Sequence, residues 1–421
     1  MVTETVSALR LSLHGQLVGY VAGYSNGKNV FSLAPEYVAN AERYPLTLSH
    51  KDPELFRRQL EKKHPFTTTQ RLHPVLSNLL PEGALREMLS QMMKTHRDNE
   101  FPLLGWLGKD LPGALVAEPV EAANIPGFVL EHHGKIEPTS IDMPDRRAYF
   151  SLAGVQMKFS MHNQDGRYIT GDPQAPGDWI VKTPSTVHPH VPLNEFTSMT
   201  LASLAGVNIP EIRLIEMDQI DDLPAINLPD EKLAFGIRRY DRLPGNERVH
   251  SEDFAQIFYA YAHDKYRVAN YEQIGKLIYQ NTQHGQRDIV QMAVRLLVNI
   301  LLANGDAHLK NWSLLYSNRM DAELSPAYDI VSTKIYITDE VQYALNMAKT
   351  KAWYDVSMEH FKAWAETVGV PWRIVHLNLK AAMDKARTLW PQALAESPMP
   401  QYQQDALRQH WKALHPDLRI G

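Results

Sequence analysis

The residues with the greatest chemical potential lie in one short segment, 304–311, which reads NGDAHLKN. Asp306 and Asn311 are five residues apart there, directly after the long apolar stretch DIVQMAVRLLVNILLAN. A carboxylate in this position can meet a substrate hydroxyl, while the amide oxygen one short loop later can bind Mg²⁺, which prefers oxygen ligands. Read alone, Asn-Gly-Asp is typical of an ordinary turn, because these residues dominate turns. The pair therefore needs a further partner before it indicates a site.

A second acidic group supplies that partner. Asp329 follows Asn311 by 18 residues and is flanked by apolar Tyr328 and Ile330. The separation of Asp306 and Asn311 equals that of the Asp and Asn in the protein-kinase catalytic loop, and Asp329 could take the role of the metal-binding aspartate of such enzymes. Together the three residues predict phosphoryl transfer assisted by magnesium.

Two other polar residues of segment 304–311 could each serve one of two purposes. His308 either contacts a phosphate or structures the loop. Lys310 either supplies positive charge near the transferred phosphoryl group or faces solvent.

An upstream segment of small residues, SLAGVQMK at 151–158, could face a phosphate. Ala153 and Gly154 would let backbone N–H groups approach anionic oxygens. The segment matches neither a Walker A loop nor the glycine-rich kinase loop, so on pattern alone a hairpin bend is the better interpretation. The candidate phosphate-loop residues are Ala153, Gly154, Val155, Gln156, Met157 and Lys158.

Lys182 lies within the apolar strand pattern IVKTP, and a lysine is seldom buried without a partner. Glu195, on the helix that follows, could form that ion pair while Lys182 holds the α- and β-phosphates of ATP; a lysine at a sheet edge is the alternative.

The segment Arg238, Arg239, Tyr240 joins two regions of different pattern. Its backbone could meet the edge of adenine and Tyr240 could cover the ring face, or it could be a charged linker strand.

Three regions must position these residues. Residues 9–35 alternate apolar and polar side chains around turns, which predicts a small antiparallel sheet, and residues 75–96 have helical periodicity. The stretch 117–145, rich in Pro, Gly and charge, predicts the first boundary. Next come strand patterns at RRAYFSLAGVQMKFSMH, DWIVKTP, EIRLIEM and KLAFGIRRYD, and a helix that ends at Gly206. Most of the chain after residue 250 is helical in pattern.

Composition excludes several kinds of protein. The 421 residues are 44% apolar with a net charge of −5, which is typical of a globular protein and not of a nucleic-acid binder that acts alone. The chain has no cysteine, so disulfide frameworks, thiolate zinc sites and cysteine nucleophiles are excluded. No apolar run approaches the ~20 residues of a membrane helix, and the first residues do not resemble a signal peptide. A cytoplasmic location is expected, with no membrane association.

With these segments in order, the chain resembles the HipA family of serine/threonine kinases. The resemblance lies in SLAGVQMK, IVKTP, LNE, RRYDR, HSEDFAQ, NGDAHLKN and PAYDI, together with NLLPEG near the amino terminus. It implies an α+β fold in which an N-terminal subdomain (1–145) precedes a bilobal kinase. The β-rich small lobe would span 146–245 and the mainly helical large lobe 246–421.

The resemblance also implies residue roles. Asp306 would be the catalytic base, Asn311 and Asp329 the magnesium ligands, and Lys182 the residue that holds the ATP phosphates. Segment 153–158 would be the phosphate loop and 238–240 the adenine hinge, although Arg238 stands where the family often has an acidic residue. Ser151, directly before the loop, would be a site of autophosphorylation.

The partners implied by the resemblance are a helix-turn-helix antitoxin dimer of the HipB type, operator DNA bound mainly through that antitoxin, and an aminoacyl-tRNA synthetase as substrate, of the glutamyl-tRNA synthetase class. Two alternatives remain open. The chain could be a small-molecule kinase on a related fold, or a pseudokinase that acts as a co-repressor in the antitoxin–DNA assembly.

Overall fold

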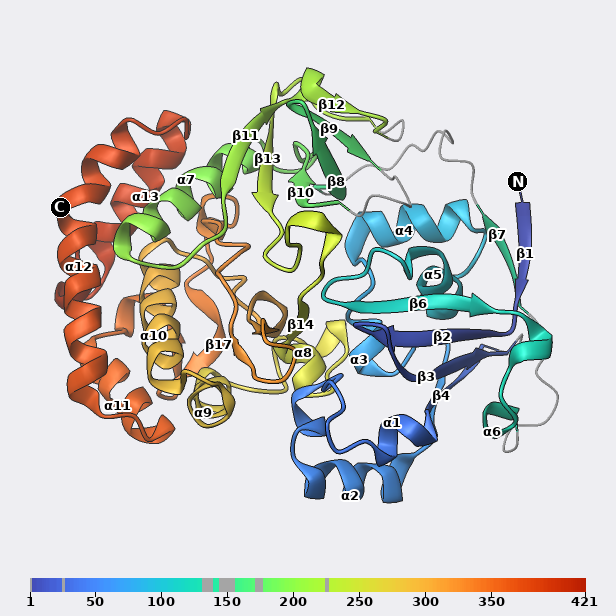
Figure 1. Cartoon of the computed structure of the whole chain (residues 1–421). Coiled ribbons are helices and arrows are strands. Elements are labelled where there is room, and N and C mark those ends of the chain that lie inside the picture. The colour runs from blue at the N-terminus through green and yellow to red at the C-terminus, as the bar shows by residue number, and fades with distance from the viewer. Residues whose placement is uncertain (1, 25–26, 131–138, 144–155, 171–176, 224–226) are drawn as a thin grey trace.

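The alternating residues near the amino terminus form a five-stranded antiparallel sheet, on the right in Figure 1. A computed structural model describes residues 2–24, 27–130, 139–143, 156–170, 177–223 and 227–421. The turn between the second and third strands has positive φ at His14 (51°) and Gly15 (80°), the geometry that joins twisted strands through a two-residue loop. The sheet has the order β5 (Phe66–Thr69), β4 (Lys28–Leu33), β3 (Gln16–Gly23), β2 (Ala8–Leu13) and β6 (Leu115–Val120).

Short helices cover this sheet. The stretch 75–96, expected to be helical, forms two helices, α3 (Pro74–Ser77) and α4 (Gly83–Met92), because Pro81 and Gly83 interrupt the pattern. The intervening segment 78–82 faces the large lobe, where Asn78 bonds to the carbonyl of Ala260 and Glu82 pairs with Lys310. The other helices of this region are α1 (Pro35–Ala39), α2 (Pro53–Lys63), α5 (Glu100–Leu107) and α6 (Gly127–Leu130).

The stretch 117–145, expected to be a boundary, contains regular structure. Strand β6 extends into it and pairs with β2 from Ala8 opposite Val120 to Leu13 opposite Leu115. Strand β7 (Thr139–Met143) pairs with β1 (Val2–Val6). Glu118 and Pro119 disfavour a strand when the sequence pattern is considered alone, so β6 is not predicted. The strand forms because its backbone pairs with β2, a distant segment of the chain.

The predicted β-rich lobe is a six-stranded sheet with one helix. Its order is β11 (Ile212–Glu216), β13 (Leu233–Arg238), β10 (Trp179–Lys182), β8 (Lys158–Gln164), β9 (Arg167–Thr170) and β12 (Ile220–Asp221). Helix α7 (Val191–Ala205) packs against β11 and β13. It ends at Gly206, whose φ of 101° is the left-handed cap that the sequence predicts.

The large lobe, on the left in Figure 1, is built around α10 (Gly285–Leu301), which packs against α9 (Tyr271–Asn281) and α12 (Trp372–Ala395). Helix α8 (Phe254–Ile257) starts at Asp253, whose side chain accepts a hydrogen bond from the Gln256 amide. The remaining elements are α11 (Met358–Val368), α13 (Gln401–Ala413), β14 (His250–Asp253), β15 (Ser313–Tyr316), β16 (Glu323–Leu324), β17 (Gln342–Met347) and β18 (Thr350–Ala352).

Two large apolar cores hold these parts together. One fills the helical lobe, and the other is shared by the N-terminal sheet and the small-lobe sheet, through residues such as Leu11, Leu33, Phe159 and Val181. The predicted α+β class, with a β-rich lobe before a helical one, is confirmed. Over the described part of the chain, none of the helices has the length and apolarity needed to span a bilayer.

Candidate active site

The segment that carries Asp306 and Asn311 is fixed at the carboxyl end of α10. Asn304 accepts a hydrogen bond from the Asp306 amide at 3.0 Å, and the Asn311 side-chain amide donates to the carbonyl of Asp306 at 2.8 Å. The Cα of Gly305 lies close to the Glu340 carboxylate, so a larger residue at this position would have to displace that side chain. The Asn311 bond uses its nitrogen, so its side-chain oxygen is the atom suited to a cation.

The Asp306 carboxylate is half exposed, at 48% of its side-chain surface, and it accepts a hydrogen bond from the Tyr266 hydroxyl. The Tyr266 ring packs edge-on against His308, with ring centres 5.0 Å apart. Burial lowers the pKa of His308 to about 4, so its imidazole is neutral at physiological pH and cannot act as a fixed cation.

Lys182 is buried and forms ion pairs with both Glu195 and Asp329. The Lys158 ammonium lies 3.0 Å from the other carboxylate oxygen of Asp329. Burial alone would raise the pKa of Asp329, but the charges of Lys158 and Lys182 hold it well below its usual range. The predicted contact between Lys182 and Glu195 is therefore present, and Asp329 joins it from the large lobe.

Asp329 is held in an uncommon backbone conformation. Its φ is 53°, a left-handed value that costs free energy for any residue other than glycine and that concentrates at functional sites. The preceding residue, Tyr328, donates its hydroxyl to the carbonyl of Lys310 at 2.8 Å. The Asp329 segment is thereby tied to segment 304–311.

The predicted phosphate loop lies partly outside the described residues, which begin again at 156: Ala153, Gly154, Val155 and Ser151 are not among them. Gln156, Met157 and Lys158 are described. Met157 is buried, and its carbonyl accepts a hydrogen bond from the Thr183 amide at 3.0 Å. Gln156 and Lys158 line the cleft described below.

The predicted adenine hinge, residues 238–240, forms ion pairs and hydrogen bonds with other parts of the protein. The guanidinium of Arg239 bonds to Asp110 and Asp241, each at 2.9 Å, and is buried. Its side chain is committed to joining the N-terminal subdomain to the small lobe. The backbone amides of Arg238 and Arg239 donate within the protein too, at 2.8 Å each, to carbonyl groups of neighbouring segments. Tyr240 lies beside Tyr328, with ring centres 5.8 Å apart.

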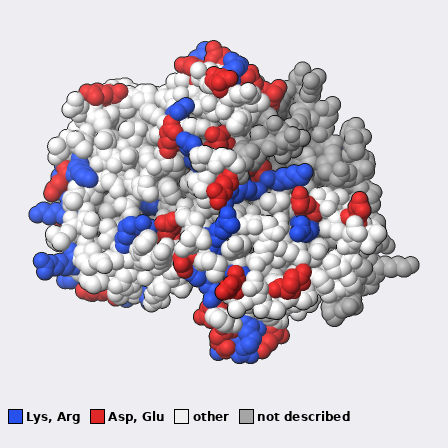
Figure 2. Space-filling view, in the orientation of Figure 1, with Lys and Arg blue, Asp and Glu red and all other residues white. Residues whose placement is uncertain are grey.

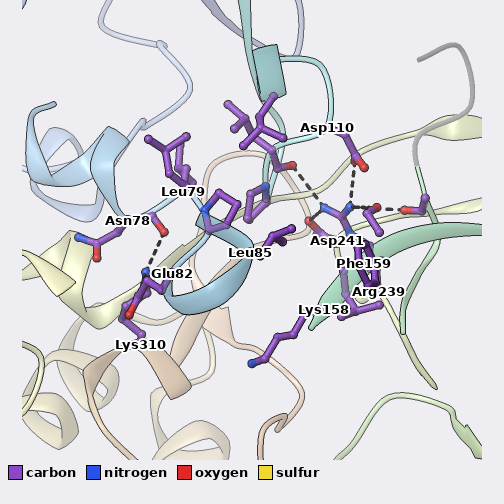
Figure 3. A pocket seen from close by; sticks show the side chains of 18 of the residues that line it. Asn78, Leu79, Glu82, Leu85, Asp110, Lys158, Phe159, Arg239, Asp241 and Lys310 are labelled. Carbon is purple, nitrogen blue, oxygen red and sulfur yellow. Dashed lines mark hydrogen bonds and ion pairs between the residues drawn. The ribbon is translucent and has the colours of Figure 1, made fainter. Parts of the chain in front are cut away.

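Lys310 points toward the N-terminal subdomain. Its ammonium lies 2.6 Å from a carboxylate oxygen of Glu82 and donates to the Asn78 carbonyl at 3.0 Å (Figure 3). Lys265, next to Tyr266 in the chain, pairs with the other oxygen of Glu82 at 3.0 Å.

Most of these residues line one cleft, which lies between the N-terminal subdomain and the two lobes. They are Asn78, Glu82, Gln156, Lys158, Lys182, Arg238, Arg239, Tyr240, Lys265, Asp306, His308, Lys310, Asn311, Tyr328 and Asp329. Figure 3 shows Lys158 extending into it, and Figure 2 shows Lys and Arg side chains gathered across the middle of that face with acidic side chains beside them. The cleft has a volume of about 1710 Å³. Sites for one small ligand are roughly 300–1,000 Å³, so this cleft has room for a nucleotide and part of a second substrate.

The lining fits a nucleotide and its magnesium. Gln156 Nε2 and His308 Nδ1 are buried atoms that bond to no described residue, and both residues line the cleft. Lys158 and Lys182 supply positive charge for phosphates. Among the described residues no group of three or more His, Asp or Glu side chains could hold a metal ion. Mg²⁺ commonly takes one or two protein ligands and completes its shell with phosphates and water.

Sequence reasoning missed Tyr266 and Glu82 as site residues. Tyr266 lies in the unpatterned segment HDKYR, where nothing marks it. Glu82 carried a usable signal, because a Pro-Glu-Gly turn between two apolar helices exposes a carboxylate at a fixed position.

Most of the chain is similar to known proteins. Residues 9–118 match the model of the HipA N-terminal domain, and residues 150–390 match that of the HipA-like C-terminal domain. The chain is 35% identical to a Sinorhizobium fredii protein named "Putative kinase Y4dM" over 96% of both chains. It is 26% identical to the serine/threonine-protein kinase toxin HipA of Shewanella oneidensis over 78% of both.

A solved structure shares the fold. It is that of HipA from Shewanella oneidensis in complex with HipB and operator DNA, with a TM-score of 0.70 at 19% identity, over 96% of this chain and 95% of that one. The two family models together span most of the chain and include segment 304–311 and Asp329. The chain therefore belongs to the HipA family of serine/threonine kinases.

Proposed function

We propose that this protein transfers the γ-phosphoryl group of ATP, with Mg²⁺, to a serine or threonine of another protein. The observation that carries the proposal is Lys182, which contacts both Glu195 of the small lobe and Asp329 of the large lobe in the cleft that holds Asp306. A buried lysine so placed can bind phosphates while its two carboxylates hold the lobes together.

The residues have distinct tasks in this mechanism. Lys158 and Lys182 neutralise phosphate charge. Asp306 accepts the proton of the acceptor hydroxyl as that oxygen bonds to phosphorus and ADP leaves. Asn311 and Asp329 would hold the magnesium, which supplies charge neutralisation to the phosphates. Positioning and charge therefore account for most of the rate enhancement.

The test is transfer of label from radioactive ATP to protein, with Asp306→Asn as the comparison. The substitution keeps the side-chain shape but removes the base, so transfer falls by roughly two to four orders of magnitude while the fold survives. Near-normal transfer by Asp306→Asn would remove Asp306 from the mechanism. Label on a metabolite instead of protein would indicate a small-molecule kinase, and no ATP turnover at all would indicate a pseudokinase.

We propose further that the protein acts in the cytoplasm as the toxin of a toxin–antitoxin pair, with a HipB-like antitoxin dimer as inhibitor and an aminoacyl-tRNA synthetase, of the glutamyl class, as acceptor. The HipB and operator DNA in the solved relative support the first of these partners. A net charge of −5 suggests that DNA affinity comes mainly from the antitoxin. Mobility-shift titrations should show weak, salt-sensitive binding by this chain alone and tight binding with antitoxin; phosphoproteomics after induction would identify the acceptor.

Ser151 stays a proposed site of autophosphorylation. A phosphate there adds roughly −1.5 to −2 charges and would repel ATP phosphates from the adjoining loop. Mass spectrometry after incubation with Mg·ATP should find the modification, and the modified protein should bind ATP poorly. An unmodified Ser151 in active enzyme would exclude this regulation.

A further inference from the structure

A carboxylate from the N-terminal subdomain reaches the catalytic segment of the large lobe. Glu82, at the start of α4, contacts Lys310 through one oxygen at 2.6 Å and Lys265 through the other at 3.0 Å. Burial alone would raise the pKa of Glu82, but the two lysine charges lower it to about 2, so the group is ionised at physiological pH. The contact is therefore a charged clamp made by one side chain on two cations.

Each clamped lysine adjoins a proposed catalytic contact. Lys310 precedes Asn311 and accepts the Tyr328 hydroxyl through its carbonyl at 2.8 Å. Lys265 precedes Tyr266, and its carbonyl accepts the Leu309 amide at 3.3 Å. A shift of Lys310 would therefore move Asn311, the proposed magnesium ligand. A shift of Lys265 would move Tyr266, which contacts Asp306.

The segment that carries Glu82 is itself anchored. The side-chain amide of Asn78 donates to the carbonyls of Pro74 at 2.9 Å and Ala260 at 2.7 Å, and the Asn78 carbonyl accepts from Lys310. Figure 3 shows Asn78, Glu82 and Lys310 together at one end of the cavity. Glu82 is therefore held on a fixed support and not on a free loop.

We propose that Glu82 is a positioning residue for phosphoryl transfer, through which the N-terminal subdomain fixes the catalytic segment 304–311. When the Glu82 charge is removed, Lys265 and Lys310 lose the carboxylate that they share. Lys310 is then drawn toward Asp253, whose carboxylate already lies 4.0 Å from its ammonium. The inference rests on the proposed kinase function and adds to it a dependence of the kinase lobes on this subdomain.

The experiment compares Glu82→Gln with Glu87→Gln in the full chain. Glu87 lies on the same helix, is exposed and does not line the cleft. Glu82→Gln should lower kcat by roughly 10- to 100-fold, the cost of a small misplacement of reacting groups. It should raise KM for ATP by less than it lowers kcat, because Lys158 and Lys182, which would bind the phosphates, are not among the Glu82 contacts. Glu87→Gln should match the wild type in both.

Two further measurements separate positioning from a loss of folding. Acetic anhydride labelling, read by mass spectrometry, should modify Lys265 and Lys310 several times faster in Glu82→Gln than in Glu87→Gln. Lys310→Met should lower kcat similarly, and the double variant should be no worse than either single one, since both break the same contact. Lys310→Met also tests the clamp if Glu82→Gln does not fold.

The outcomes are distinct. A wild-type protein that transfers no phosphate overturns the proposed function, and this inference with it. An active wild type with unchanged or higher kcat in Glu82→Gln overturns the inference alone, as do unchanged lysine labelling and additive effects of the two substitutions.

Discussion

The hydroxyl of Tyr266 donates a hydrogen bond to the carboxylate of Asp306, the group that we assign as catalytic base. An acceptor serine or threonine must make the same kind of contact before it can be phosphorylated. Tyr266 thus occupies, from within the chain, a position that a substrate hydroxyl has to take.

Tyr266→Phe should therefore lower KM for the protein acceptor. The hydrogen bond to a charged group is worth about 1.5–3 kcal/mol, so removing the competing donor should improve acceptor binding by about 10- to 150-fold. The ring would still pack on His308. Steady-state kinetics at saturating ATP would measure the change, and a raised KM for the acceptor would show that the phenol helps to bind substrate instead.

Asp329→Ala should weaken nucleotide binding only when Mg²⁺ is present, because the substitution removes a metal ligand. Without magnesium the variant should bind ATP at least as well as the wild type, since Lys158 and Lys182 are released from Asp329. Calorimetric titrations with magnesium and with EDTA make the comparison. An equal loss of affinity in both conditions would assign Asp329 a purely structural role.

Glu252 should make stability depend on pH. It is buried, accepts the Leu48 amide at 2.7 Å and the Tyr316 hydroxyl at 2.5 Å, and burial raises its pKa from 4.5 to about 7. The folded protein therefore binds a proton more tightly than the unfolded chain. Stability due to this group is complete below about pH 4.5 and is lost as pH rises toward 7, on the order of 3 kcal/mol.

Glu252→Gln, a neutral mimic of the protonated side chain, should remove most of that loss and raise the melting temperature at pH 8. A smaller decrease of stability with rising pH would remain, because burial also raises the pKa of Asp253, to about 6. Thermal unfolding between pH 5 and 8 would test this, with exposed Glu87→Gln as the control. Parallel pH profiles of the wild type and Glu252→Gln would contradict it.

Arg239→Met should lower the free energy of unfolding. The substitution leaves Asp110 and Asp241 without one of their two arginine partners, and breaking a buried pair costs roughly 3 kcal/mol. Arg238→Gln, at an exposed neighbour, should barely change the melting temperature. If Arg239→Met unfolds like the wild type but binds ATP poorly, the side chain serves the nucleotide and not the domain contact.

Local patterns predicted much of the fold. Alternation in residues 9–35 predicted the antiparallel strands, the apolar run before Asn304 predicted α10, and Gly206 predicted the end of α7. These features depend on backbone propensity and on which face of an element is apolar, so neighbouring residues carry the information. Strand β6 escaped prediction because its pairing partner, β2, is about a hundred residues away in the chain.

By itself the sequence determined which chemistry the chain could hold: Asp306 and Asn311 at loop spacing, Asp329 after them, and Lys182 within an apolar strand. Only the tertiary structure decided which charges meet. Asp329 lies 147 residues from Lys182, and Glu82 lies 228 residues from Lys310. The long-range packing of three regions brings these groups together, and burial within that packing makes their pairing obligatory, because a charge removed from water needs an opposite charge beside it.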